Sequence, residues 1–134
     1  MPLSKIRLVK PLMIFAALAL IAVGANFLVA PLVFGHPELQ MSSIPNGTVL
    51  SLTQVPGKVT LTFSEGLDTK RSVIYVVQAG PDILVDQGDL FINGTTMAIS
   101  LNALQTGVYQ IHWIAISSDD AGYREGIVSF AVKD

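Results

Sequence analysis

The side chains best suited to chemistry in this sequence are its two histidines, because the chain contains no cysteine. Without cysteine there is no disulfide, no thiolate metal site and no cysteine nucleophile. His36 follows a long apolar run, and a cut after Gly35 would leave it as the first residue. An α-amine and an imidazole nitrogen at one chain terminus together chelate Cu(II). The alternative is a histidine in a linker beside a membrane.

Carboxylates that follow two of the predicted strands could complete such a metal site. Glu65 follows one of these strands, and Asp119 and Asp120 follow another. Loop residues at one end of a β-sandwich can converge, so these side chains could meet His36. The alternative is that all three carboxylates are solvated turn residues. The second histidine, His112, falls in the middle of a strand, where we predict a place on the polar face of the sheet.

The remaining composition excludes several other functions. The sequence has no glycine-rich phosphate loop, no serine and histidine in a nucleophile motif, and no histidine-rich tract. Eight basic and ten acidic residues give a net charge of −2, which provides no basic surface for nucleic acid. We therefore predict a protein that is not an enzyme and does not bind nucleic acid.

The amino-terminal 35 residues carry most of the apolar excess. Residues 1–10 hold three basic residues and no acidic one, and residues 11–35 hold no charge at all. This pattern predicts a signal peptide or a membrane anchor helix, with its basic end in the cytoplasm. Cleavage after Ala25, cleavage after Gly35 and no cleavage are all compatible with the sequence. Residues 36–134 then form an exported domain with five basic and ten acidic residues, a net charge of −5.

The pattern of the exported part is typical of an all-β domain. Val59, Leu61 and Phe63 alternate with threonines, and a second alternating run around Trp113 predicts a strand whose apolar face contains this tryptophan. Turn sequences such as Pro45-Asn46-Gly47 separate the predicted strands. We expect seven strands, at residues 39–44, 59–63, 72–78, 83–87, 96–101, 108–117 and 127–132. This arrangement favours a seven-stranded Greek-key, immunoglobulin-like β-sandwich that follows the hydrophobic segment.

The motifs of the exported domain, in their order and spacing, resemble those of the CopC family of periplasmic copper-resistance proteins. The matching segments are His36-Pro37-Glu38-Leu39, Ser43-Ile44-Pro45-Asn46-Gly47, Val59-Thr60-Leu61-Thr62-Phe63-Ser64-Glu65, Gly107-Val108-Tyr109-Gln110-Ile111-His112-Trp113, Ser117-Ser118-Asp119 and Gly126-Ile127-Val128-Ser129-Phe130-Ala131-Val132. The resemblance implies an immunoglobulin-like β-sandwich that holds Cu(II).

The resemblance also implies a set of copper ligands. His36 corresponds to the terminal histidine, Glu65 to a glutamate that takes part in some members, and Asp119 or Asp120 to the aspartate of an Asp-x-His motif. The second histidine of that motif is missing, because Gly122 or Ala121 stands at its place, depending on the alignment. The methionine-rich Cu(I) segment has no counterpart either, and we predict that the isolated Met41 and Met97 fill the core.

The function that the resemblance implies is copper resistance or homeostasis outside the cytoplasmic membrane. The domain would sequester Cu(II) and deliver it to a membrane copper permease, with membrane attachment through residues 11–35 if they are not cleaved. The alternative function is a membrane-tethered, immunoglobulin-like interaction module that has lost copper binding.

Overall fold

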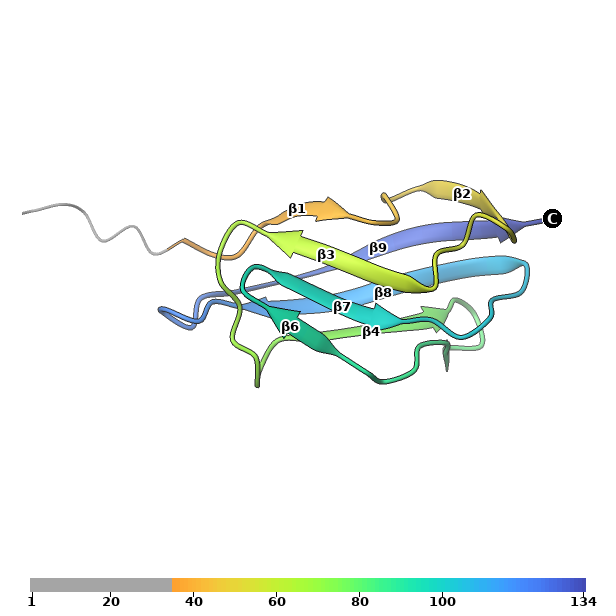
Figure 1. The fold of residues 1–134 in the computed structure, drawn as a ribbon. Helices are drawn as coiled ribbons and strands as arrows, with labels where there is room; N and C mark the ends of the chain where they lie inside the picture. Colours follow the sequence, from red (N-terminus) through yellow and green to blue (C-terminus); the bar gives the residue numbers. More distant parts are fainter. Residues whose placement is uncertain (1–34) are drawn as a thin grey trace, which may run out of the picture. The chain divides into compact units, whose positions relative to one another are not determined.

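The structure is a computed structural model that describes residues 35–134, and the predicted signal or anchor helix falls on residues outside this range. The described residues form two facing β-sheets (Figure 1). The strands are β1 (Leu39–Ser42), β2 (Thr48–Ser51), β3 (Lys58–Phe63), β4 (Val73–Gln78), β5 (Ile83–Leu84), β6 (Phe91–Asn93), β7 (Thr96–Ser100), β8 (Gly107–Ile116) and β9 (Tyr123–Lys133). No helix that could cross a membrane occurs in residues 35–134.

One sheet has four strands in the order β1-β3-β7-β6, and the other has five in the order β2-β9-β8-β4-β5. The predicted all-β sandwich is therefore confirmed, although residues 35–134 contain nine strands where the sequence predicted seven. The two additional strands are β2 and β6, which contain four and three residues. The Greek-key description of the connections stays a prediction.

The core lies between the sheets and follows the alternation of the central strands. Val59, Leu61 and Phe63 of β3 are buried, as the sequence predicted, and their threonine neighbours face outward. The alternate residues of β8 from Tyr109 to Ala115 point inward in the same way. The buried cluster comprises Ile44, Val59, Leu61, Phe63, Leu67, Ile74, Val76, Met97, Ile99, Leu101, Tyr109, Ile111, Trp113, Ala115, Val128, Phe130 and Val132. These side chains come from both sheets and form one continuous core between them.

Trp113 packs in the core against a glycine on the neighbouring strand. Trp113 of β8 pairs directly with Gly126 of β9, and the indole covers the inward side of the glycine backbone. A Cβ atom on Gly126 would lie 2.5 Å from Cζ2 of the indole and 2.8 Å from Cε2. On its other side the indole meets the ring of Phe63 edge to face, with ring centroids 5.1 Å apart. The missing side chain at position 126 therefore provides the room for the tryptophan.

We expect Gly126→Ala to destabilise the domain by about 1–3 kcal/mol, because the added methyl group overlaps a rigid, buried ring. Urea unfolding followed by circular dichroism measures the change. Gly57→Ala is the matched control, since nothing lies within 4 Å of the place that a Cβ atom would take on this glycine. Equal stability of the two variants would contradict the packing described for Trp113.

The amino-terminal strands connect the two sheets. β1 pairs with β3 in the four-stranded sheet, and after the turn at Asn46 the chain continues as β2, which runs parallel to β9 in the five-stranded sheet. Two hydrogen bonds join this turn to Ser129 of β9. Gly47 N donates to Ser129 O at 2.7 Å, and Ser129 N donates to Asn46 Oδ1 at 2.8 Å. The turn and β2 therefore hold their position in the five-stranded sheet through contacts with β9, the last strand.

Candidate metal centre

The segment that carries His36 is attached to the end of β3. Glu38 N donates to Ser64 Oγ, and Ser64 N donates back to Glu38 O, both at 2.9 Å. Pro37 is almost completely buried, and the Glu38 carboxylate lies 3.5 Å from the Arg124 guanidinium on β9. His36 itself is exposed at this end of the sandwich. The position of the backbone at His36 is thus set by both sheets.

The loop between β8 and β9 reaches the same end (Figure 1). Ser117 N donates to Gly122 O at 2.8 Å and closes the loop, and Gly122 N donates to Asp120 Oδ1 at 2.9 Å. Ser118 N donates to Gly66 O at 3.0 Å, which joins this loop to the one that follows β3. Three segments that are distant in the sequence therefore meet: the amino-terminal segment, the loop after β3 and the β8–β9 loop.

Two of the predicted ligands meet at Gly122. A Cβ atom on this glycine would lie 2.9 Å from His36 Nδ1 and 3.1 Å from Asp120 Oδ1. The imidazole nitrogen and the carboxylate oxygen are therefore no more than about 6 Å apart. The same point lies 3.2 Å from the carbonyl oxygen of Gly35. The structure thus places His36 and Asp120 on either side of a position that has no side chain.

Glu65 lies against the residue before His36. A Cβ atom on Gly35 would overlap Glu65 Oε1, so the carboxylate packs directly on the Gly35 backbone. Asp119 is an exposed residue of the β8–β9 loop, and its backbone N donates to Ser117 Oγ at 3.3 Å. No contact in the described residues joins the Asp119 carboxylate to His36. The structure therefore places Asp120 near the His36 imidazole, Glu65 against the residue before this histidine, and Asp119 in neither contact.

The loop that carries Glu65 is ordered by Asp68. This carboxylate accepts hydrogen bonds from Lys70 N at 2.9 Å and from Arg71 N at 3.0 Å. It also forms an ion pair with the Arg71 guanidinium at 2.8 Å. The hydrogen bond from Arg71 is the main cause that lowers the pKa of Asp68 below its ordinary value. The ionised carboxylate makes these contacts, so they are present at neutral pH. They are lost as the pH falls through the lowered pKa of Asp68.

The donor atoms at this end suit Cu(II) in kind, because an imidazole nitrogen and carboxylate oxygens form the nitrogen and oxygen set that this ion accepts. The set is incomplete. Residues 35–134 contain no group of three or more histidine, aspartate and glutamate side chains that could hold a metal ion. The candidate ligands were named from the sequence. The sequence did not show that His36 and Asp120 approach each other at Gly122, or that Glu65 lies against Gly35. Close approach at a glycine has no signal in the sequence.

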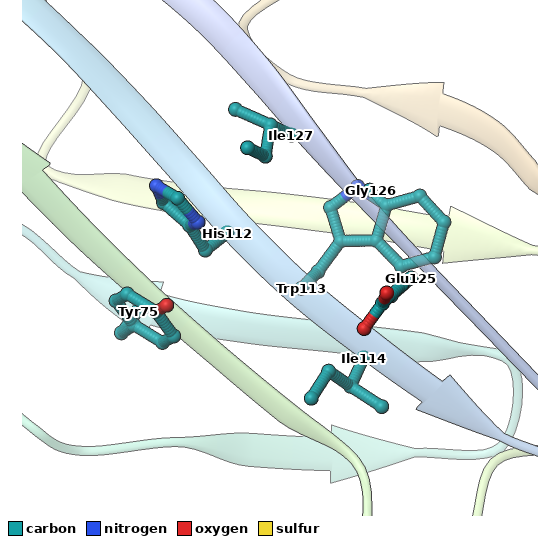
Figure 2. Close-up of a pocket in the computed structure, with 7 residues that line it drawn as sticks. All are labelled: Tyr75, His112, Trp113, Ile114, Glu125, Gly126 and Ile127. Carbon is teal, nitrogen blue, oxygen red and sulfur yellow. The ribbon is translucent and has the colours of Figure 1, made fainter.

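The second histidine lies elsewhere, on the outer face of the five-stranded sheet. The His112 ring stacks on Tyr75, with ring centroids 4.9 Å apart and an angle of 8° between the rings. Its Nε2 atom lies 3.1 Å from Gln110 Oε1. The pair borders a hollow of about 420 Å³ whose walls include Ile127 and Glu125 (Figure 2). As predicted, His112 is a mid-strand residue that points outward, but its cross-strand neighbours, Tyr75 and Ile127, make its surroundings less polar than predicted.

Comparisons with known proteins agree with this architecture. The family model of the CopC domain matches residues 39–133. Among solved structures, the chain is similar to CopC from Methylosinus trichosporium OB3b, with a TM-score of 0.61 and 23% sequence identity. The match covers 73% of this chain and 94% of that chain, and at this identity it establishes the fold. No curated protein matches the chain.

Proposed function

Because this chain belongs to the CopC family, we propose that it binds Cu(II) outside the cytoplasmic membrane, in copper resistance or homeostasis. In this proposal the domain is a carrier and not an enzyme. It sequesters the ion and delivers it to a membrane copper permease. Residues 1–35 direct export, and residues 36–134 form the copper-binding domain.

Two observations carry the proposal: the approach of His36 and Asp120 at Gly122, and the contact of Glu65 with Gly35, the residue before His36. Gly35 fills the space next to the Glu65 carboxylate, and its carbonyl oxygen faces the Gly122 position. A cut after Gly35 removes this residue and creates the α-amine of His36 at the same place. The amine and the imidazole then supply two nitrogen donors, and Asp120 and Glu65 supply oxygen donors. Asp119 is the alternative aspartate.

A tethered interaction module is the second candidate function. Two observations favour it: the position of the second histidine holds Gly122 or Ala121, depending on the alignment, and the described residues include no three-ligand group. If residues 1–35 stay attached, His36 has no free amine and the chelate does not form. The amino terminus of the natural protein therefore separates the two functions.

The test is an intact mass and amino-terminal sequence of the protein recovered from its native host, followed by Cu(II) titration of the same material. A chain that begins at His36 and binds one copper ion supports the carrier. A chain that keeps its hydrophobic segment, or begins near Asn26, and binds no copper supports the tethered module.

Restoring the missing imidazole should strengthen copper binding. In a chain that begins at His36, we expect Gly122→His to raise the Cu(II) affinity on the order of tenfold or more, about 1.4 kcal/mol, because imidazole is a good ligand for this ion. The new side chain starts between His36 Nδ1 and Asp120 Oδ1, and the exposed His36 ring has room to move aside. Competition with a chromophoric chelator measures the affinity.

Ala121→His is the matched control for this experiment, since it adds the same side chain one residue earlier. Ala121 has a φ of 59°, a conformation that a histidine adopts at some cost in energy. A gain at position 122 alone supports Asp120 as the aspartate ligand. A gain at position 121 alone supports Asp119 instead, and no gain at either position counts against the site.

A further inference from the structure

Two copies of the tripeptide Asn-Gly-Thr lie in connections between strands. Asn46-Gly47-Thr48 leads from β1 into β2, and Asn93-Gly94-Thr95 leads from β6 into β7. The asparagine and the glycine of each copy are exposed to solvent. In an Asn-Gly pair the glycine nitrogen can attack the side-chain carbonyl carbon of the asparagine, because glycine has no Cβ atom to hinder the approach. The two copies contain the same reactive atoms, so a difference in their reactivity comes mainly from the fold.

Hydrogen bonds hold the reactive atoms of the first copy. Asn46 Oδ1 accepts from Ser129 N at 2.8 Å, and Gly47 N donates to Ser129 O at 2.7 Å. The side-chain amide of Asn46 and the nitrogen that would attack it are therefore both bound to β9. Both hydrogen bonds have to break before the two groups can react with each other. The fold thus protects Asn46.

The second copy lacks this protection. Asn93 pairs with Thr96 across a two-residue hairpin turn, and Gly94 has a φ of 60° at its first central position. Neither the Asn93 side chain nor Gly94 N has a hydrogen-bond partner among residues 35–134. No atom lies within 4 Å of the place that a Cβ atom would take on Gly94. The reacting groups of this copy are therefore open to water and free to approach each other.

We propose that Asn93 is a site of spontaneous deamidation and isomerisation. Gly94 N forms a bond to Asn93 Cγ, the bond from Cγ to Nδ2 breaks, and ammonia leaves with the proton of Gly94 N. Water then opens the resulting succinimide ring at one of its two carbonyl carbons. Opening at Cγ gives aspartate, and opening at the main-chain carbonyl gives isoaspartate, whose main chain contains an additional carbon. No oxidant or reductant takes part, and either product adds a negative charge at neutral pH.

The turn that contains Asn93 supports the loop that carries Glu65. Thr95 O accepts a hydrogen bond from Phe63 N, and Gly94 O accepts one from Leu67 N, both at 2.9 Å. The turn therefore holds the loop on both sides of Glu65, beside the end of β3 (Figure 1). An additional main-chain carbon at residue 93 displaces both carbonyl groups from their partners. Isomerisation should thus loosen this loop, whereas conversion to aspartate keeps the length of the main chain.

The loosened loop belongs to the candidate metal centre. Ser64 N donates to Glu38 O at 2.9 Å, and Ser118 N donates to Gly66 O at 3.0 Å. The loop is thereby connected to the segment that carries His36 and to the β8–β9 loop. A change in the β6–β7 turn can therefore reach all three segments of the site. Any effect on copper binding rests on the proposed function, so the modification is best measured without a metal ion.

Peptide mapping of the full chain, purified in detergent, tests the modification. Trypsin cuts after Lys58 and Arg71 and so places the two asparagines on different peptides. During incubation in a mildly alkaline buffer, we expect Asn93 to convert at least about tenfold faster than Asn46, because two hydrogen bonds must break at Asn46. In urea the two should convert at nearly equal rates. Equal rates in the folded chain, faster conversion of Asn46, or no conversion of Asn93 would overturn the proposal.

Two variants assign the mass change to its residue. Asn93→Gln should abolish the fast conversion, because the longer side chain closes a ring much less readily. Asn46→Gln is the matched control and should leave the rate at Asn93 unchanged. A mass gain that persists in the same peptide of Asn93→Gln would place the reaction at another residue and contradict the assignment.

Hydrogen exchange tests the effect on the loop. The isoaspartate form is separated from the unmodified chain by ion exchange, and mass spectrometry follows exchange in residues 63–67. We expect the amides of Phe63 and Leu67 to exchange about fivefold faster or more in this form, since each loses a hydrogen bond. Asn93→Asp is the matched control, with the same charge and no additional main-chain carbon, and should exchange as the unmodified chain does. Equal exchange in all three forms would show that the turn does not control the loop.

Discussion

Replacing His36 by alanine should abolish tight Cu(II) binding by the chain that begins at this residue. The change removes the imidazole, whose Nδ1 atom approaches the Gly122 position together with Asp120 Oδ1. We expect the affinity to fall by more than about 100-fold, because loss of even a hydrogen-bond partner of a metal ligand costs about 10- to 100-fold. Isothermal titration, or competition with a chromophoric chelator, measures the change.

His112→Ala is the control for this prediction, since it removes the other imidazole of the chain. His112 stacks on Tyr75 on the outer face of the five-stranded sheet, so its removal should leave the copper affinity unchanged. If His36→Ala binds copper as the unmodified domain does, the assignment of this end of the sandwich is wrong. If His112→Ala loses the binding instead, copper is held on the sheet face.

Replacing Trp113 by alanine should destabilise the domain by about 3–5 kcal/mol, the usual cost of removing a buried aromatic side chain. The indole is 7% exposed and packs against Phe63 and Gly126, so its removal leaves a cavity between the sheets. Because Trp113 is the single tryptophan of the chain, unfolding has to be followed by circular dichroism. A change near zero would contradict its place in the core.

Two further variants show which part of the indole matters. The Nε1 atom of Trp113 is buried and has no hydrogen-bond partner in the described residues. Trp113→Phe keeps a ring against Phe63 and removes this unpaired donor, so it should cost less than Trp113→Ala. Gly126→Ala should be almost harmless in the Trp113→Ala background, since the atoms that it overlaps are gone. Additive effects of the two substitutions would contradict their direct contact.

The fold could be predicted from the sequence where a strand is buried on one side and exposed on the other. β3 and β8 alternate strictly, and their inward residues were predicted individually, from Val59 to Trp113. Two short strands gave no such signal. β2 follows closely on the turn at Asn46 and has four residues, and β6 has three, which is too short for an alternation to show.

The prediction for Met41 was wrong for a related reason. Met97 fills the core, but Met41 is 68% exposed. The pairing of β1 with β3 shifts register between Leu39 and Met41, and a shift by one residue reverses the face to which a side chain points. Such an irregularity at an edge strand depends on tertiary contacts, and the residue types do not reveal it.

The candidate site could be predicted in part. The sequence predicted that loop carboxylates could converge with His36, and in the structure Asp120 lies near its imidazole while Glu65 lies against the preceding residue, Gly35; their role as ligands stays a prediction. The choice between Asp119 and Asp120 depends on the conformation of the β8–β9 loop. Its hydrogen bond from Gly122 N to Asp120 Oδ1 brings the second carboxylate to the position facing His36. Local backbone geometry of this kind has no counterpart in residue spacing.

The parallel pairing of β2 with β9 has a consequence for the order of events during synthesis. The hydrogen bond between Ser129 and Asn46 joins residues 83 positions apart, so the first part of the sandwich cannot be completed before the last strand exists. Contacts of such long range make folding slow, since loop closure must precede them. A growing chain therefore cannot complete the β2–β9 edge of the five-stranded sheet until its last strand has been synthesised.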